Sequence, residues 1–125
     1  MDTSLKVLVV DDSSTMRRIV KGVLTNLGFH DIEEMDNGWD AWERILMGGV
    51  GLAICDWNMP RMTGIELLNA VRSHPDHKWL PFVMLTAEGQ KENILEAVRL
   101  QVSQYLMKPF TAELLVRKVK RALSN

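Results

Sequence analysis

Short apolar runs alternate with amphipathic stretches five times along this chain, and this alternation limits the possible folds more than any other feature. The runs at 6–10, 51–56, 81–85 and 105–107 are almost continuously apolar, which is typical of strands buried on both faces of a parallel sheet. A weaker strand is predicted at 31–36, where acidic residues interrupt the apolar pattern. The sequence therefore predicts five strands.

An amphipathic stretch with helical spacing of its apolar residues follows each predicted strand. The predicted helices run from Met16 to Leu27, over 38–47, from Ile65 to Val71, from Ile94 to Leu100, and from a cap at Thr111 to Ala122. In the second helix, Ala41, Trp42, Ile45 and Leu46 are expected to face inward. Five βα units predict an α/β fold, with a doubly wound parallel five-stranded sheet and helices on both faces. The whole chain, 1–125, is expected to be one domain without an output domain.

Composition narrows the class of protein. A length of 125 residues suits one compact domain, and the net charge of −1 offers no general attraction to nucleic acid or to an acidic membrane. No apolar run approaches the ~18 residues of a membrane span, and the single cysteine forms no internal disulfide. A cytoplasmic location is expected.

The basic run at 117–121 is interpreted as a solvated helix face, or alternatively as a docking surface for an acidic peptide.

Four charged residues stand where predicted strands end. Asp11 and Asp12 follow the first strand, Asp56 ends the third, and Lys108 follows the fifth. Because the carboxyl ends of parallel strands share one edge of the sheet, we expect three acids and one base to meet in one crevice.

This cluster suits phosphoryl chemistry that depends on a metal. Three carboxylates would repel a bare phosphate, and no loop has the glycine pattern of a phosphate cradle. Clustered aspartates instead suit Mg²⁺, which prefers oxygen ligands and reverses the local charge. One carboxylate could then act as a nucleophile and form an acyl phosphate. Lys108 would contact a phosphoryl oxygen, and Thr86 offers a hydroxyl at the same edge.

Four motifs carry a resemblance to a known family. They lie at 9–12 (Val-Val-Asp-Asp), 56–60 (Asp-Trp-Asn-Met-Pro), 86–88 (Thr-Ala-Glu) and 108–110 (Lys-Pro-Phe). With these motifs the chain resembles the receiver domains of two-component signalling over nearly its whole length, and in particular the single-domain chemotaxis response regulators. The resemblance implies a flavodoxin-like strand order, 2-1-3-4-5, and a cis Lys108-Pro109 bond.

The resemblance also implies roles for the acidic cluster. Asp56 would accept a phosphoryl group from a histidine kinase. Mg²⁺ would be held by Asp12, Asp56 and the backbone carbonyl of Asn58, with Asp11 helping through water. Lys108 would bind the phosphoryl group.

Further roles concern switching and output. Thr86, Ala87 and Tyr105 would respond to the phosphoryl group, and Asn58, Glu88 and Trp57 would tune the site. The face that binds the flagellar motor switch protein would contain Lys91, Ile94, Tyr105, Lys118 and Arg121. The implied protein is a monomeric messenger, not an enzyme, which assists its own phosphorylation and dephosphorylation. The resemblance also allows a dedicated phosphatase as a partner.

Alternatives remain within and outside this family. A stand-alone receiver could instead serve a phosphorelay or another motility pathway, because Ser13, Gly89, Gln90, Gln101 and Gln104 depart from the chemotaxis pattern. A haloacid-dehalogenase-type phosphatase needs Asp-x-Asp after the first strand, which this chain lacks, and two acids at the phosphate loop argue against a flavin carrier.

Three other features receive simpler interpretations. Cys55 is expected to be an inert core residue. Trp57 is expected to form a half-exposed wall of the site. His74 and His77 stand three residues apart, but Pro75 disfavours a helix there, so a metal-binding pair is the less favoured interpretation.

Overall fold

The computed structural model describes residues 1–87 and 91–124. Five strands and five helices alternate along this part of the chain, as the sequence predicts. Their bounds are β1 (Lys6–Val10), α1 (Ser14–Leu27), β2 (Ile32–Met35), α2 (Gly38–Leu46), β3 (Val50–Asp56), α3 (Gly64–Ser73), β4 (Phe82–Ala87), α4 (Lys91–Arg99), β5 (Gln104–Lys108) and α5 (Ala112–Leu123). All strand pairs are parallel and the sheet order is β2-β1-β3-β4-β5. The expected flavodoxin-like topology is therefore confirmed.

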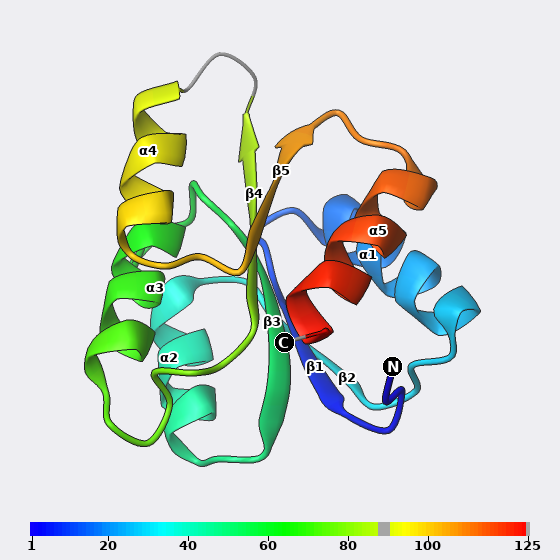
Figure 1. The fold of residues 1–125 in the computed structure, drawn as a ribbon, viewed down its shortest axis with the longest axis horizontal. Coiled ribbons are helices and arrows are strands. Elements are labelled where there is room, and N and C mark those ends of the chain that lie inside the picture. The colour runs from blue at the N-terminus through cyan, green and yellow to red at the C-terminus, as the bar shows by residue number, and fades with distance from the viewer. Residues whose placement is uncertain (88–90, 125) are drawn as a thin grey trace.

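The sheet lies between two layers of helices. Figure 1 shows α1 and α5 on one face and α2, α3 and α4 on the other. Because strand side chains alternate, Val9 and Ile54 pack under α1 and α5, whereas Val10 and Cys55 pack under the opposite layer. A strand covered on both faces needs apolar residues at consecutive positions for this reason, which explains the continuous apolar runs.

Side-chain caps fix where most of the helices begin. Ser13, Asn37, Thr63 and Thr111 each accept a hydrogen bond from a backbone N–H in the first turn of the helix that follows. Thr63 also forms a capping box with Glu66. Caps of this kind stabilise a helix by about 1 kcal/mol each, so the loops that follow β1 and β3 are held at defined positions.

Edge strand β2 carries its acids in ion pairs. Glu33 contacts Lys6 and Arg44, and Glu34 contacts Arg17 at 3.0 Å. The hydrogen bonds to Arg44 and to Lys6 lower the pKa of Glu33 to about 2. The weak apolar pattern of this strand thus follows from its place at the edge of the sheet.

Two apolar residues that fit the helical pattern are exposed. Leu46, predicted to face inward, is 45% exposed, and Ile19 is 48% exposed. Successive helical residues point about 100° apart, so the burial of Ile45 and Val20 turns their neighbours toward solvent. The inward prediction for Leu46 was wrong for this reason.

Two backbone features bear on the family resemblance. The Lys108-Pro109 peptide bond is cis, as the resemblance implies. Gln101 adopts a left-handed conformation with φ of 62°, which is the region that favours glycine.

None of the helices in the described part of the chain combines the length and apolar character needed to span a bilayer.

Candidate functional site

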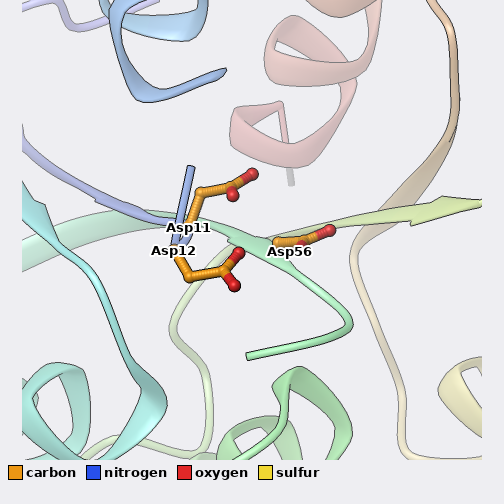
Figure 2. A group of neighbouring side chains, drawn as sticks. All are labelled: Asp11, Asp12 and Asp56. Atoms are coloured by element: carbon orange, nitrogen blue, oxygen red, sulfur yellow. The ribbon is translucent and has the colours of Figure 1, made fainter. Parts of the chain in front are cut away.

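Three carboxylates meet at the carboxyl ends of β1 and β3. Asp11 and Asp12 follow β1, and Asp56 is the last residue of β3. Val10 pairs with Cys55 across the two strands, so the residues that follow each of them are neighbours. One carboxylate oxygen of each aspartate lies within 4.8 Å of the others, and Figure 2 shows the three side chains around one space. The predicted crevice is therefore present.

The three acids differ in exposure. Asp11 is only 1% exposed and Asp56 is also buried, whereas Asp12 is exposed. Burial, aided by the charge of Asp56, raises the pKa of Asp11, although the backbone N–H of Ser13 donates to its Oδ1 at 2.9 Å. The site thus concentrates negative charge at a position where one side remains open to solvent.

Lys108 provides the positive charge of the crevice. Its backbone pairs with Ala87 at the end of β4. Its Nζ donates to Asp56 Oδ1 at 2.8 Å and to Asp11 Oδ2 at 3.3 Å. Burial alone would lower the pKa of Lys108, but the hydrogen bond to Asp56 and the charges of Asp56 and Asp11 outweigh it and raise the pKa. The lysine is therefore held as a cation between two carboxylates.

The donor set fits a hard divalent cation. All three side chains offer carboxylate oxygen, and they converge from two adjacent strand ends. Mg²⁺ takes one or two carboxylates and keeps several waters, so the open side at Asp12 would leave room for solvent ligands. Asn58 is exposed in the loop two residues after Asp56. Within the described residues, no other group of three or more such ligands lies close enough together to hold a metal.

Thr86 carries a buried polar atom without a partner. The residue lies in β4 opposite Met107 of β5 and is 1% exposed. Its Oγ1 forms no hydrogen bond with the described part of the chain. Buried hydroxyl groups are nearly always satisfied, so this one is an exception among the described residues. Ala87, next along β4, is exposed.

The predicted output residues gather on α4, β5 and α5. Tyr105 lies in β5 and is half-buried, with Lys118 Nζ 5.4 Å from its ring centroid. Lys91 and Arg121 are exposed, and Ile94 is half-buried. These residues therefore lie on the α4–β5–α5 face, and their role in output stays a prediction.

Sequence reasoning missed the apolar character of this surface. Leu95, Val98 and Met107 are all exposed large apolar side chains on α4 and β5. The helical spacing of Leu95 and Val98 marked the fourth helix but did not show which way they point. Only Ala97 of the α4 residues is buried, so the helix directs Leu95 and Val98 outward.

Trp57 was predicted to be half-exposed, and that prediction was wrong. The side chain is only 7% exposed and packs in the core between the sheet and the α2–α4 layer. Its backbone N–H donates to Leu85 O at 2.9 Å, which continues the β3 pairing beyond Asp56. This pairing turns the ring inward instead of toward the crevice mouth.

The remaining sequence predictions have separate outcomes. Cys55 is buried, and burial raises the pKa of its thiol, as expected for an inert core residue. The rings of His74 and His77 lie 4.7 Å apart beyond the end of α3. Glu88, Gly89 and Gln90 lie outside the described residues.

Arg17 contacts the site although no motif pointed to it. Its Nη1 donates to the backbone carbonyl of Asp11 at 2.6 Å, and its Nε donates to Glu34 at 3.0 Å. The arginine thereby ties the loop after β1 to edge strand β2. Its position in α1, one turn after the cap, was the available signal.

Fold and site together describe a parallel sheet with an acidic, lysine-bridged crevice at its carboxyl edge. The sequence model of one protein family, the response regulator receiver domain, matches residues 7–120. The chain belongs to this family of two-component response regulators.

The similar proteins narrow the group further. The chain is 46% identical over 117 residues to the chemotaxis protein CheY of Pseudomonas aeruginosa, which covers 94% of each chain. It is 43% identical over 122 residues to the chemotaxis protein CheY1 of Helicobacter pylori, covering 97% of this chain and 98% of that one. Among solved structures, the chemotaxis response regulator CheY4 of Vibrio cholerae superposes with a TM-score of 0.87 at 35% identity, covering 96% and 99% of the two chains. This receiver is therefore of the CheY type.

Proposed function

We propose that this chain is a phosphorylation-activated messenger whose phosphoryl acceptor is Asp56. The observation that carries the proposal is the bridge from Lys108 Nζ to both Asp56 and Asp11, with Asp12 open to solvent beside them. A histidine kinase of the chemotaxis type would supply the phosphoryl group. The bond between phosphorus and a ring nitrogen of the kinase's phosphohistidine would break as an Asp56 oxygen forms the new bond to phosphorus.

The surrounding residues would prepare this transfer. When bound, Mg²⁺ would offset the charge of the aspartates and polarise the phosphoryl oxygens. Asp11, Asp12, Asp56 and the Asn58 carbonyl would hold it. In the unphosphorylated chain, Lys108 Nζ donates to Asp56 and Asp11. When the metal also binds these carboxylates, the ammonium group would turn to a phosphoryl oxygen, which carries the added negative charge.

The same charge change would be transmitted to the surface. A phosphoryl group on Asp56 gives the hydroxyl of Thr86 the acceptor that it lacks, and Ala87 lies between this residue and α4. Movement of Thr86 would free space for Tyr105 to turn inward. The α4–β5–α5 face would then bind the flagellar motor switch protein, in a monomeric protein of the cytoplasm.

Labelling with a small phosphodonor tests the acceptor. The parent chain with Mg²⁺ should incorporate label that hydroxylamine removes, and Asp56→Asn should abolish it. Asp76→Asn is the matched control, because Asp76 is an exposed acid on the α3–β4 connection, at the other end of the sheet. Undiminished, acid-stable label in Asp56→Asn would contradict the assignment.

Partner binding tests the output. The amino-terminal peptide of a motor switch protein should bind more tightly when beryllofluoride occupies the site, and Tyr105→Ala should reduce that gain. A receiver of a phosphorelay would instead pass its label to a histidine domain and show no gain with the peptide.

A further inference from the structure

A second surface lies at the end of the sheet opposite the phosphoacceptor site. A pocket of about 430 Å³ opens between the connection from α3 to β4, the turn from α4 to β5 and the end of α5. Both connections lead into the amino ends of their strands, whereas Asp56 and Lys108 stand at carboxyl ends (Figure 1). The residues that line the pocket are Arg72, Lys78, Trp79, Pro81, Gln101, Val102, Ser103 and Ala122.

Trp79 makes this pocket unusual. Its side chain is 80% exposed, and Lys78 Nζ lies 5.3 Å from the centre of its ring. Single exposed apolar residues are common, but an indole at the rim of a pocket resembles the anchors of protein interfaces, where tryptophan and arginine are enriched. Trp79 therefore offers a flat apolar surface that a partner side chain could cover.

The charge of the pocket is of one sign. Among the described residues, Arg72 and Lys78 line it and no acidic side chain does. Neither cation forms an ion pair with a carboxylate in the described part of the chain, and burial lowers the pKa of Arg72. Asp76 is exposed nearby in the chain but does not line the pocket. A ligand with negative charge would thus find uncompensated cations.

The walls of the pocket are already fixed. Arg72 donates to the carbonyls of Gln101, Lys78 and Leu80 at 3.0, 3.0 and 2.7 Å. Ser103 Oγ accepts from the backbone N–H of Phe82 at 2.9 Å. These bonds join both connections into one rigid unit, so a partner would not have to order them on binding.

The basic run of α5 ends beside this pocket. Ala122 lines it, and Lys118 lies one turn earlier on the same side of the helix. Arg121, which is exposed, immediately precedes Ala122. The run, which includes Lys118 and Arg121 of the predicted output face, thus carries positive charge from that face to the rim of the pocket.

We propose that this pocket, defined by Arg72, Lys78 and Trp79, docks an acidic peptide segment of a partner protein that carries an apolar side chain between its carboxylates. The apolar side chain covers the Trp79 ring, and the carboxylates meet Lys78 Nζ and the second N–H of Arg72 Nη2, whose other N–H donates to Ser103 Oγ at 3.4 Å. Because the pocket shares no residue with the phosphoacceptor site, its occupancy does not depend on the phosphoryl state of Asp56. The pocket serves attachment, in contrast to the phosphorylation-dependent output proposed for the α4–β5–α5 face, which it meets at the end of α5.

The test follows the amide and indole N–H resonances of the ¹⁵N-labelled full chain during titration with a short synthetic peptide of alternating glutamate and leucine. The Trp79 indole and Ser103 amide should shift, equally with and without beryllofluoride. Lys78→Glu and Trp79→Ala should each weaken binding by about tenfold or more. Arg18→Glu and Met47→Ala, exposed positions outside the pocket, should leave the affinity unchanged.

Several results would overturn the docking site. A peptide with lysine in place of glutamate should not bind, and equal binding by it would remove the charge argument. Equal loss with Arg18→Glu would reveal general attraction only. Shifts confined to Tyr105 and Lys91 would place the peptide on the output face, and shifts at Trp79 with phosphatidylglycerol vesicles but not with peptide would assign the pocket to lipid. None of these results bears on labelling of Asp56.

Discussion

Replacing Thr86 with valine should stabilise the unphosphorylated protein and at the same time abolish its response. The Thr86 hydroxyl is buried with no hydrogen-bond partner in the described chain, and such a group costs about 1–3 kcal/mol of desolvation. Valine has nearly the same shape and removes that cost. Since the extra methyl carbon needs some accommodation, we expect the free energy of unfolding to rise by about 1 kcal/mol.

Urea denaturation of the metal-free protein measures this change. With an m-value of about 2 kcal/mol/M, the midpoint should rise by about 0.5 M. Thr86→Ala is the matched control. It also removes the hydroxyl but leaves a cavity where the methyl group packed, so it should be less stable than the valine variant by about 1–2 kcal/mol.

The functional half of the prediction uses the same two variants. Both should accept label on Asp56 with Mg²⁺, because the substitutions leave the carboxylates of Asp11, Asp12 and Asp56 in place. Neither should gain affinity for the motor switch peptide. A valine variant with a urea midpoint below that of the parent chain would refute the claim that the hydroxyl is unsatisfied, and a normal gain in peptide affinity would refute its role in switching.

Other perturbations address the loop after β3, the bridging lysine and the edge of the sheet. A Cβ at Gly64 would lie 2.3 Å from the carbonyl oxygen of Asp56, so Gly64→Ala should destabilise the fold by about 1–3 kcal/mol and slow labelling. A Cβ at Gly22 would meet nothing within 4 Å, so the control Gly22→Ala should stabilise α1 by up to about 1 kcal/mol. Equal urea midpoints for the two variants would contradict this. Lys108→Ala should keep the fold and bind Mg²⁺ at least as tightly, measured by tryptophan fluorescence, because the ammonium competes for the same oxygens, while a partner affinity that still rises on phosphorylation would show that the lysine is dispensable. The pKa of Glu33 is lowered from 4.5 to about 2 in the folded state, so its contribution to the free energy of unfolding is complete above about pH 4.5 and is lost as the pH falls toward 2. Glu33→Gln should lower the free energy of unfolding by about 1 kcal/mol or less at neutral pH and reduce its fall between pH 4.5 and 2. Parallel curves of stability against pH for the two proteins would count against this.

The fold was predictable because strands buried on both faces leave a continuous apolar record. The runs that end at Val10 and Asp56 gave their strands nearly to the residue. Edge strand β2 was harder to predict, because Glu33 and Glu34 interrupt its apolar pattern. Their charges are compensated by cations from other elements, which the local sequence does not show. The grouping of the charged residues at one edge followed from parallel topology alone.

Side-chain direction was less predictable than element type. Trp57 follows the phosphoacceptor position, and only the backbone bond to Leu85 shows that its ring turns into the core. Leu46 fits a helical pattern whose exact phase depends on tertiary packing. Arg17 acts through a carbonyl, which no residue pattern encodes. Periodicity identifies a face approximately, whereas the contacts at its margin depend on the neighbouring elements.

The paired glutamates of β2 have a consequence for how this molecule associates. A strand from another chain that added beside β2 would have to strip solvent from Glu33 and Glu34 and compete with their lysine and arginine partners. Charged edges of this kind resist sheet-to-sheet aggregation. The opposite edge of the sheet is β5, so any extended segment that seeks backbone pairing is directed to the side where Tyr105 and Met107 lie. Edge chemistry at β2 thus disfavours strand addition there and leaves β5 as the edge with fewer charges to displace.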